Sequence, residues 1–149
     1  MHNNQCKILH WNVNGIRSIM KKKIYKNNLF ETYLTKQNAD IIIFTETKIS
    51  HDARESHDKV NLLFDSYEFK YHTHADKKGY SGVSVFSKIK PIKQIKSPII
   101  DNEGRIIILE YNKFILISVY VPNSGAKLLK LNYRTHEWDK KFLNLCTKL

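Results

Sequence analysis

The feature that most constrains this chain is an uninterrupted apolar run, Ile-Ile-Ile-Phe, at residues 41–44. A run that is apolar at every position is typical of a strand covered on both faces of its sheet. Another apolar run at 7–11 predicts a second strand, and the stretch 16–37 between the two has no Gly or Pro and carries apolar residues at helical spacing. Strand, helix and strand in this order form a crossover unit, so the sequence predicts parallel strands in an α/β fold.

The pattern changes twice further along the chain. Residues 49–65 are polar apart from a small apolar island, and strand-like segments without a helix between them follow at 67–72, 82–87, 92–95, 105–111 and 114–121. The pair Asn112-Lys113 is a compact hairpin link between the last two segments. A final helix is expected from residue 128 onward, because apolar residues recur on one helical face: Leu131, Trp138, Phe142, Leu145 and Leu149.

Charge is the informative part of the composition. Lys and Arg number 25 against 14 Asp and Glu, which gives a formal net charge of +11. Such a surplus favours a polyanionic partner such as nucleic acid, because lysines near phosphates release condensed counterions. A genome rich in A and T produces the same surplus through its codons for Lys, Asn and Ile, so charge alone leaves both explanations open.

The remaining global features predict a soluble intracellular protein, without deciding between cytoplasm and nucleus. The apolar runs have the length of strands rather than of a membrane span, and the N-terminus lacks the character of a signal peptide. Cys6 and Cys146 stand at opposite ends of the chain and form no metal-ligand pair by spacing, which is consistent with a reducing compartment.

Polar side chains stand at the ends of three predicted strands. Asn12 and Asn14 follow the first strand, and Glu46 follows the second, where an open sheet with crossover connections collects its ligands. A carboxylate beside carboxamide oxygens suits Mg²⁺, although a Glu in this position also serves as a helix cap or a loop ion pair. Tyr120 and Asn123 end a third strand, where a tyrosine donates to or activates a group at phosphorus; the alternative is a plain strand end closed by a proline turn.

Two turns carry further candidates. Tyr80 lies between two glycines just before a strand, where an aromatic residue can wedge against a nucleotide or stack on a base, and where an ordinary turn is equally consistent with the sequence. Arg105 begins a strand directly after a turn, a position suited to a phosphate contact. His72, His74 and Asp76 resemble a metal clip only weakly, because no third ordered ligand or Cys is near them in the sequence.

The order of these motifs resembles that of the exonuclease III-type AP endonucleases, within the endonuclease/exonuclease/phosphatase superfamily. The motifs are KILHWNVNGIRS at 7–18, ADIIIFTETK at 39–48, GYSGV at 79–83, DNEGR at 101–105, YVPNSG at 120–125 and LNYR at 131–134, followed by Trp138-Asp139 and Phe142-Leu143. They cover nearly the whole chain at compatible spacing. The YVPNSG stretch argues against the phosphoinositide phosphatase, sphingomyelinase and deadenylase branches.

The resemblance implies a fold, an activity and a set of site residues. The implied fold is a four-layer α/β sandwich, with two sheets face to face and helices outside. The implied activity is Mg²⁺-dependent hydrolysis of DNA 5′ to abasic sites in base excision repair, with Mn²⁺ as a possible substitute. By motif position, Glu46 and Asn12 would hold the metal, Asn14 would lie in the next shell, Tyr120 would be the active-site tyrosine, and Asn123 would orient the scissile phosphate.

The resemblance also implies contacts with DNA along one surface. These would come from Tyr80, Arg105, Lys48 and Lys127. Some relatives place an Arg directly after the Asn-x-Gly of the YVPNSG motif, whereas this chain has Ala126 and then Lys127.

The second half of this family carries a Gly-Asp-x-Asn segment, whose Asp activates water, and a Ser-Asp-His that polarises the phosphate. Neither follows Tyr120 here, so residues 1–149 are expected to form the N-terminal half of the domain and to be inactive alone. Two main interpretations stay open. The chain is a piece of a repair nuclease, completed by a second polypeptide or by sequence lost through a frameshift or a fragmentary gene model, or it is a non-catalytic DNA-binding or interaction half-domain; a decayed gene product is a third, and a second polypeptide or a second copy is the expected cover for an exposed sheet. A half-domain of this kind is expected to expose the apolar face of one sheet.

Overall fold

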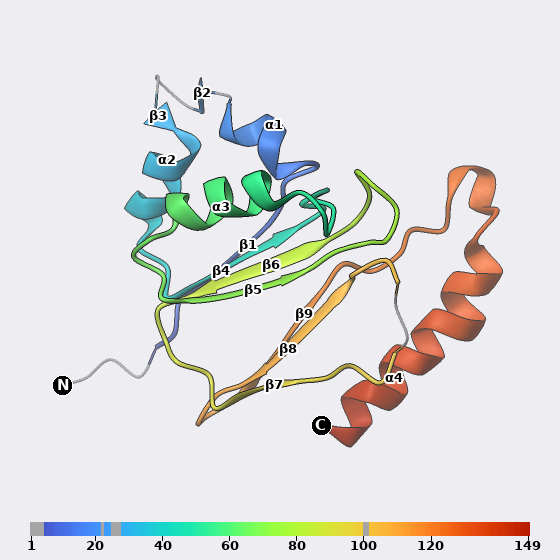
Figure 1. Ribbon diagram of the computed structural model, residues 1–149. Helices are drawn as coiled ribbons and strands as arrows, with labels where there is room; N and C mark the ends of the chain where they lie inside the picture. The colour runs from blue at the N-terminus through green and yellow to red at the C-terminus, as the bar shows by residue number, and fades with distance from the viewer. Residues whose placement is uncertain (1–4, 22, 25–27, 100–101) are drawn as a thin grey trace.

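The computed structural model of the protein describes residues 5–21, 23–24, 28–99 and 102–149. Within them the chain forms four layers (Figure 1). Three helices cover the outer face of a four-stranded sheet, a three-stranded sheet lies against its inner face, and the C-terminal helix covers the far side of that second sheet. The predicted α/β sandwich is therefore confirmed.

The four-stranded sheet has the order β1-β4-β6-β5. β1 (Ile8–Asn12) runs parallel to β4 (Ile41–Thr45), as the predicted crossover requires, and every residue of β4 is buried. β6 (Val83–Ser87) is antiparallel to β4, and β5 (Phe69–Thr73) is antiparallel to β6 at the edge. The parallel pairing matters for function, because it places the carboxyl ends of β1 and β4 side by side.

The second sheet is an antiparallel meander of the order β7-β8-β9. It consists of β7 (Lys93–Ile95), β8 (Ile106–Glu110) and β9 (Ile115–Val119). The hairpin predicted around Asn112-Lys113 joins β8 to β9 and is closed by the Tyr111 N–H, which donates to the Phe114 carbonyl at 2.9 Å.

The helix predicted over 16–37 is wrong in its extent. The structure has α1 (Ile16–Met20) and α2 (Phe30–Gln37), with the two-residue strands β2 (Lys23–Ile24) and β3 (Asn28–Leu29) paired between them. Part of the predicted stretch lies outside the described residues. The adjacent Asn27 and Asn28 in the sequence are poor helix formers, which favours a break there.

A further helix, α3 (Arg54–Leu63), occupies the polar stretch in which no element was predicted. Of its side chains Val60 is fully buried, and Phe64 directly after the helix is 2% exposed, while Leu62 is 74% exposed. No element was predicted here because most residues of this stretch are polar, which leaves few apolar positions to mark a helical period.

The C-terminal segment begins with two short turns of other helical types, η1 (Ala126–Leu128, 3₁₀) and η2 (Tyr133–Trp138, π), and continues as α4 (Asp139–Lys148). Of the five residues predicted to form its apolar face, Trp138 and Leu145 are buried and Phe142 is partly buried against the second sheet. Leu131 and Leu149 are about 40% exposed and lie outside that face. No helix in the described part of the chain combines the length and apolarity needed to cross a bilayer.

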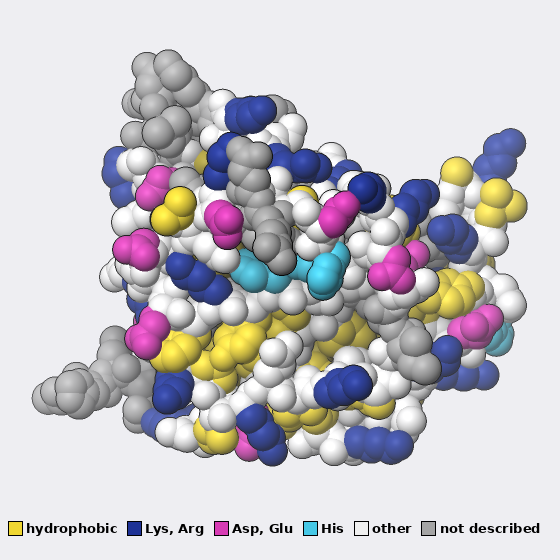
Figure 2. Space-filling view, in the orientation of Figure 1, with side chains coloured by type: hydrophobic (Ala, Val, Ile, Leu, Met, Phe, Trp, Pro, Cys, Tyr) yellow, Lys and Arg dark blue, Asp and Glu magenta, His cyan; other side chains and the backbone are white. Residues whose placement is uncertain are grey.

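The expectation that one sheet would expose its whole apolar face is wrong, because the chain contributes strands to both sheets. Their facing side chains form one core, made of Ile41, Ile43, Val83, Val85, Ile107, Leu109 and Tyr111. Apolar side chains reach the surface at the rims of the sandwich. Figure 2 shows a band of hydrophobic side chains between β5 and β7, and Ile8 on the edge strand β1 is 44% exposed.

Trp138 is expected to be essential for the attachment of α4 to the second sheet. It is 2% exposed, clusters with Ile106 and Ile108, and stacks on Phe142 at a centroid distance of 5.1 Å. Trp138→Ala should lower the free energy of unfolding by about 3–5 kcal/mol, measured by urea denaturation followed by circular dichroism. Leu143→Ala is the matched control, because Leu143 is 65% exposed on the same helix, and its effect should stay within about 0.5 kcal/mol. Equal losses in the two variants would contradict the packing described here.

Candidate functional site

The carboxyl ends of β1 and β4 bring two predicted site residues into direct contact. Asn12 is paired in register with Thr45, so the next residue, Glu46, emerges beside the Asn12 side chain. Asn12 Nδ2 donates to Glu46 Oε1 at 2.8 Å. The strand-end reasoning thus located both residues in one place.

Asn14 and Lys48 surround this pair. Asn12 Oδ1 accepts the backbone N–H of Asn14 at 3.1 Å, and Lys48 Nζ donates to Asn14 Oδ1. The same ammonium group lies 3.5 Å from Glu46 Oε2. Asn14 therefore contacts Glu46 indirectly, through the Lys48 ammonium group. Lys48 is an ion-pair partner of the carboxylate, and its side chain is 33% exposed.

The backbone at Glu46 and Lys48 adopts the left-handed conformation, with φ of 54° at both residues. Non-glycine residues pay about 1–2 kcal/mol for this conformation, which persists only where the surroundings impose it. Here the backbone bonds to both neighbouring segments: Gly15 N–H donates to the Glu46 carbonyl at 2.7 Å, and Lys48 N–H to the Ser81 carbonyl at 2.9 Å. Left-handed non-glycine residues cluster at functional sites, and this pair carries the acid and the ammonium group.

Tyr120 follows β9 and reaches Glu46 from the second sheet, close enough for each group to shift the pKa of the other. Burial, followed by the hydrogen bond to Glu46 and its negative charge, raises the pKa of Tyr120 to about 12. Burial also opposes ionisation of Glu46, but the hydrogen bonds from Asn12 and Tyr120 and the charge of Lys48 outweigh it and lower the pKa of the carboxyl. At neutral pH a protonated phenol therefore donates to an ionised carboxylate.

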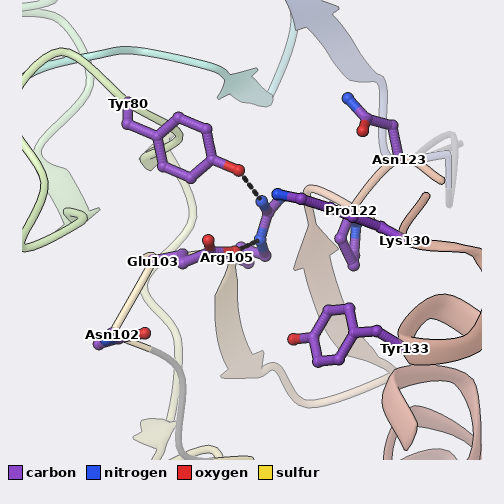
Figure 3. A pocket seen from close by; sticks show the side chains of 8 residues that line it. All are labelled: Tyr80, Asn102, Glu103, Arg105, Pro122, Asn123, Lys130 and Tyr133. Atoms are coloured by element: carbon purple, nitrogen blue, oxygen red, sulfur yellow. Dashed lines mark hydrogen bonds and ion pairs between the residues drawn. The ribbon is translucent and has the colours of Figure 1, made fainter. Parts of the chain in front are cut away.

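Arg105 lies behind the Tyr120 ring rather than on the surface. The residue is 2% exposed, and its guanidinium carbon lies 4.7 Å from the centroid of the Tyr120 ring. It donates to the Tyr120 carbonyl. Figure 3 shows its two other bonds, to the Tyr80 hydroxyl and the Glu103 carboxylate. The residue predicted to lie along DNA thus sits inside the protein, bonded to two tyrosines that were predicted separately.

A pocket of about 280 Å³ opens beside this cluster. Figure 3 shows the side chains that line it: Tyr80, Asn102, Glu103, Arg105, Pro122, Asn123, Lys130 and Tyr133. Asn123 Oδ1 accepts the N–H of Gly125 at 3.0 Å, which holds the turn after Pro122. Lys130 and Tyr133 were not predicted as site residues, although the LNYR motif that contains Tyr133 was part of the recognised pattern.

Lys127 stands apart from the Glu46–Tyr120 pair. It is exposed on η1, and its φ of 50° bends the chain at that point. His72 on β5 has partners of its own, because it bonds to Ser84 Oγ and to Asn61 Oδ1, both at 2.9 Å. Nowhere in the described ranges do three His, Cys, Asp or Glu side chains gather as a metal cluster.

Comparison with known proteins identifies the family. Residues 9–139 match the endonuclease/exonuclease/phosphatase family. The chain belongs to this family. Its sequence is 38% identical over 98% of its length to a DNA-(apurinic or apyrimidinic site) endonuclease of Dictyostelium discoideum, and 38% identical over 96% to an exodeoxyribonuclease of Bacillus subtilis. It covers 38% and 53% of these two relatives, so it spans about half of their length or less.

Two solved structures share the fold of this chain. The AP endonuclease LMAP of Leishmania major superposes with a TM-score of 0.69 at 24% identity, over 92% of this chain and 46% of that one. An AP endonuclease from Archaeoglobus fulgidus gives a TM-score of 0.71 at 21% identity, over 97% of this chain and 52% of that one. The family resemblance read from the motifs, including its restriction to the N-terminal part, is therefore confirmed.

Proposed function

We propose that this member of the endonuclease/exonuclease/phosphatase family carries part of the active site of a Mg²⁺-dependent nuclease that cleaves DNA on the 5′ side of abasic sites, in base excision repair. The observation that supports this most is the contact of Glu46 with both Asn12 and Tyr120. It joins the two sheets at the strand ends and offers oxygen ligands beside a hydrogen-bond donor. The relatives named as apurinic-site endonuclease and exodeoxyribonuclease point to the same chemistry.

The oxygen donors of the site fit Mg²⁺. Glu46 presents an ionised carboxylate and Asn12 a carboxamide oxygen, the hard ligands that Mg²⁺ prefers, and this ion commonly binds through one or two protein carboxylates while keeping several waters. Glu46 and Asn12 would hold the ion, with Mn²⁺ as a substitute. When bound, the metal would neutralise charge on the scissile phosphate.

The phenol of Tyr120 would act as a neutral donor. A pKa of about 12 keeps the hydroxyl protonated at neutral pH, which favours donation to an anionic oxygen over the tyrosinate alternative. Asn123, on the wall of the adjacent pocket, would orient the same phosphate through its carboxamide.

Duplex DNA is the proposed partner. The net charge of +11 supplies general attraction to phosphates. Tyr80 and Lys130 line the pocket beside Asn123, while Lys48 and Lys127 add charge near the strand ends and on η1. A second polypeptide or a second copy would cover the partly exposed edge at β1, where Ile8 is 44% exposed.

The water-activating Asp and the phosphate-polarising His implied by the family have no counterpart among the residues after Tyr120. We propose that residues 1–149 therefore act as the N-terminal half of a catalytic domain. A fusion supplies the missing groups: the whole chain is joined to the part of the Bacillus subtilis exodeoxyribonuclease that lies beyond its matched region. The substrate is a duplex oligonucleotide with one abasic analogue, incubated with Mg²⁺ or with EDTA.

The expected result is Mg²⁺-dependent incision by the fusion and none by the chain alone, since each missing acid–base group is typically worth ~10²–10⁴-fold. A folded fusion that binds the duplex but does not cut it would overturn the nuclease proposal and favour a non-catalytic DNA-binding half-domain. Incision by the 149-residue chain itself would overturn the half-domain proposal instead.

A further inference from the structure

Arg105 is the only charged residue that is buried in the described part of the chain. Its side chain is 3% exposed and carries a permanent positive charge. A buried charge is strongly destabilising unless it is paired and hydrogen-bonded. The partners of the guanidinium therefore indicate the structural role of Arg105.

Those groups come from three separate segments. Arg105 Nε donates to Glu103 Oε2 at 2.6 Å, Nη1 donates to the Tyr120 carbonyl at 3.0 Å, and Nη2 donates to the Tyr80 hydroxyl at 3.0 Å. The guanidinium also lies 4.7 Å from the Tyr120 ring centroid and 5.6 Å from that of Tyr80. One planar fork thus bonds to, and lies against, both tyrosines of the candidate site.

The backbone holds Arg105 rigidly in this place. Its carbonyl accepts the Tyr120 N–H at 2.9 Å, so the Tyr120 main chain is bonded to Arg105 from both sides. On the other side, Gly104 lies directly against the backbone of His74, and the Asn102 carbonyl accepts the Asp76 N–H at 2.9 Å. The turn that delivers the guanidinium is therefore anchored to the chain that follows β5.

We propose that Arg105 is a positioning residue that fixes Tyr80 and Tyr120 in one geometry and makes no contact with nucleic acid itself. This inference rests on the proposed function and deepens it, because it connects the tyrosine on the pocket wall to the tyrosine that donates to Glu46. Tyr80 is the member that meets the ligand: it is partly exposed, and Lys77 Nζ lies 5.5 Å from its ring centroid. A nucleotide that moves the Tyr80 ring thereby moves the support of Tyr120.

The proposal is tested first with variants that separate the charge of Arg105 from its forked set of hydrogen bonds. Arg105→Lys keeps the charge but cannot make the forked set of bonds to both tyrosines. Tyr80→Phe keeps the stacking ring and removes only the hydroxyl that accepts from Arg105. Lys130→Met is the matched control for a direct phosphate contact, because Lys130 is an exposed cation on the same pocket. Binding of the whole chain to an abasic duplex is measured by fluorescence anisotropy from about 50 to 200 mM salt.

A positioning role predicts that Arg105→Lys weakens binding about tenfold, the order of one lost stacking contact, without changing the slope of log affinity against log salt. Tyr80→Phe should weaken binding in the same direction with the same slope. Lys130→Met should reduce the slope by about 0.9. Wild-type affinity in Arg105→Lys would mean that charge alone suffices and would overturn the proposal. A fourth variant, Arg105→Met, removes the charge at this position, and a reduced slope in it would also overturn the proposal, because it would indicate a direct phosphate contact.

A second readout does not need DNA. In protein with ¹³C-labelled tyrosine rings, Arg105→Lys should shift the ring signals of Tyr80 and Tyr120 together, and Tyr80→Phe should shift that of Tyr120, with the thermal unfolding midpoint recorded for each variant. If the tyrosine signals stay in place in folded variants, the positioning role is wrong. If the wild-type chain does not bind the duplex while the signals move as expected, the proposed function fails and the positioning role stands.

Discussion

Glu46→Gln is expected to weaken Mn²⁺ or Mg²⁺ binding to the chain by more than about tenfold. Replacing even the outer-shell partner of a metal ligand costs about 10–100-fold in metal affinity, and Gln removes the carboxylate that meets Asn12 and Tyr120. In the fusion described above, the incision rate should fall by at least about 100-fold, since charge stabilisation at the phosphate is lost.

Metal affinity is measured by calorimetric titration of Mn²⁺ into the 149-residue chain. Glu68→Gln is the control, because Glu68 is an exposed carboxylate just before β5 and its removal changes the net charge equally. If both variants bind Mn²⁺ as the wild type does, the metal does not sit at Glu46 and that assignment has to be abandoned.

Glu46→Gln should also change how the free energy of unfolding depends on pH in the acid range. Folding lowers the pKa of Glu46, so the carboxylate contributes stability above its unfolded pKa of about 4.3, and this contribution is lost as the pH falls through the folded pKa. Stability measured by urea denaturation should therefore fall less steeply below about pH 4 in Glu46→Gln than in the wild type.

Gly104→Ala is expected to destabilise the fold by about 3–5 kcal/mol, or to prevent folding. Gly104 has a φ of +61°, which costs an L-residue about 1–2 kcal/mol, and an added Cβ would overlap the backbone of His74. Backbone atoms cannot rotate away as a side chain does, so the turn before Arg105 would have to move, at the cost of an overpacked core position.

Gly79→Ala separates the two contributions. Gly79 has a similar φ of +69°, but no atom lies within 4 Å of its added Cβ. It should lose only the conformational part, about 1–2 kcal/mol in urea denaturation. If Gly104→Ala were no worse than Gly79→Ala, the turn would be free of His74, and the anchoring of Arg105 described above would be wrong.

The sequence predicted the fold best where burial leaves a local signature. β4 is covered on both faces, so its uninterrupted apolar composition predicts the strand. The parallel pairing with β1 follows from the helical spacing of apolar residues between the two strands. α3 was missed because its stretch of sequence is mostly polar. The division of 16–37 into α1 and α2 depends on a small strand pair, β2 and β3, whose formation is a matter of tertiary context.

The candidate site shows the same division between local and tertiary information. The rule that ligands gather at strand ends placed Asn12 beside Glu46, because parallel neighbours end at the same edge. The bond between Glu46 and Tyr120 required knowing how the two sheets face each other. Arg105 was expected at a phosphate, and its burial could not be foreseen, since it follows from the meeting of Glu103, Tyr80 and Tyr120.

Glu46 and Tyr120 come from different sheets, so their contact forms only when the two sheets have docked. A chain whose sheets have formed but not yet docked has the acid and the phenol on separate bodies, with ordinary pKa values for both. In partly folded molecules the two groups are therefore not yet next to each other. When warming separates the two sheets, the contact and the pKa shifts of both groups should be lost together.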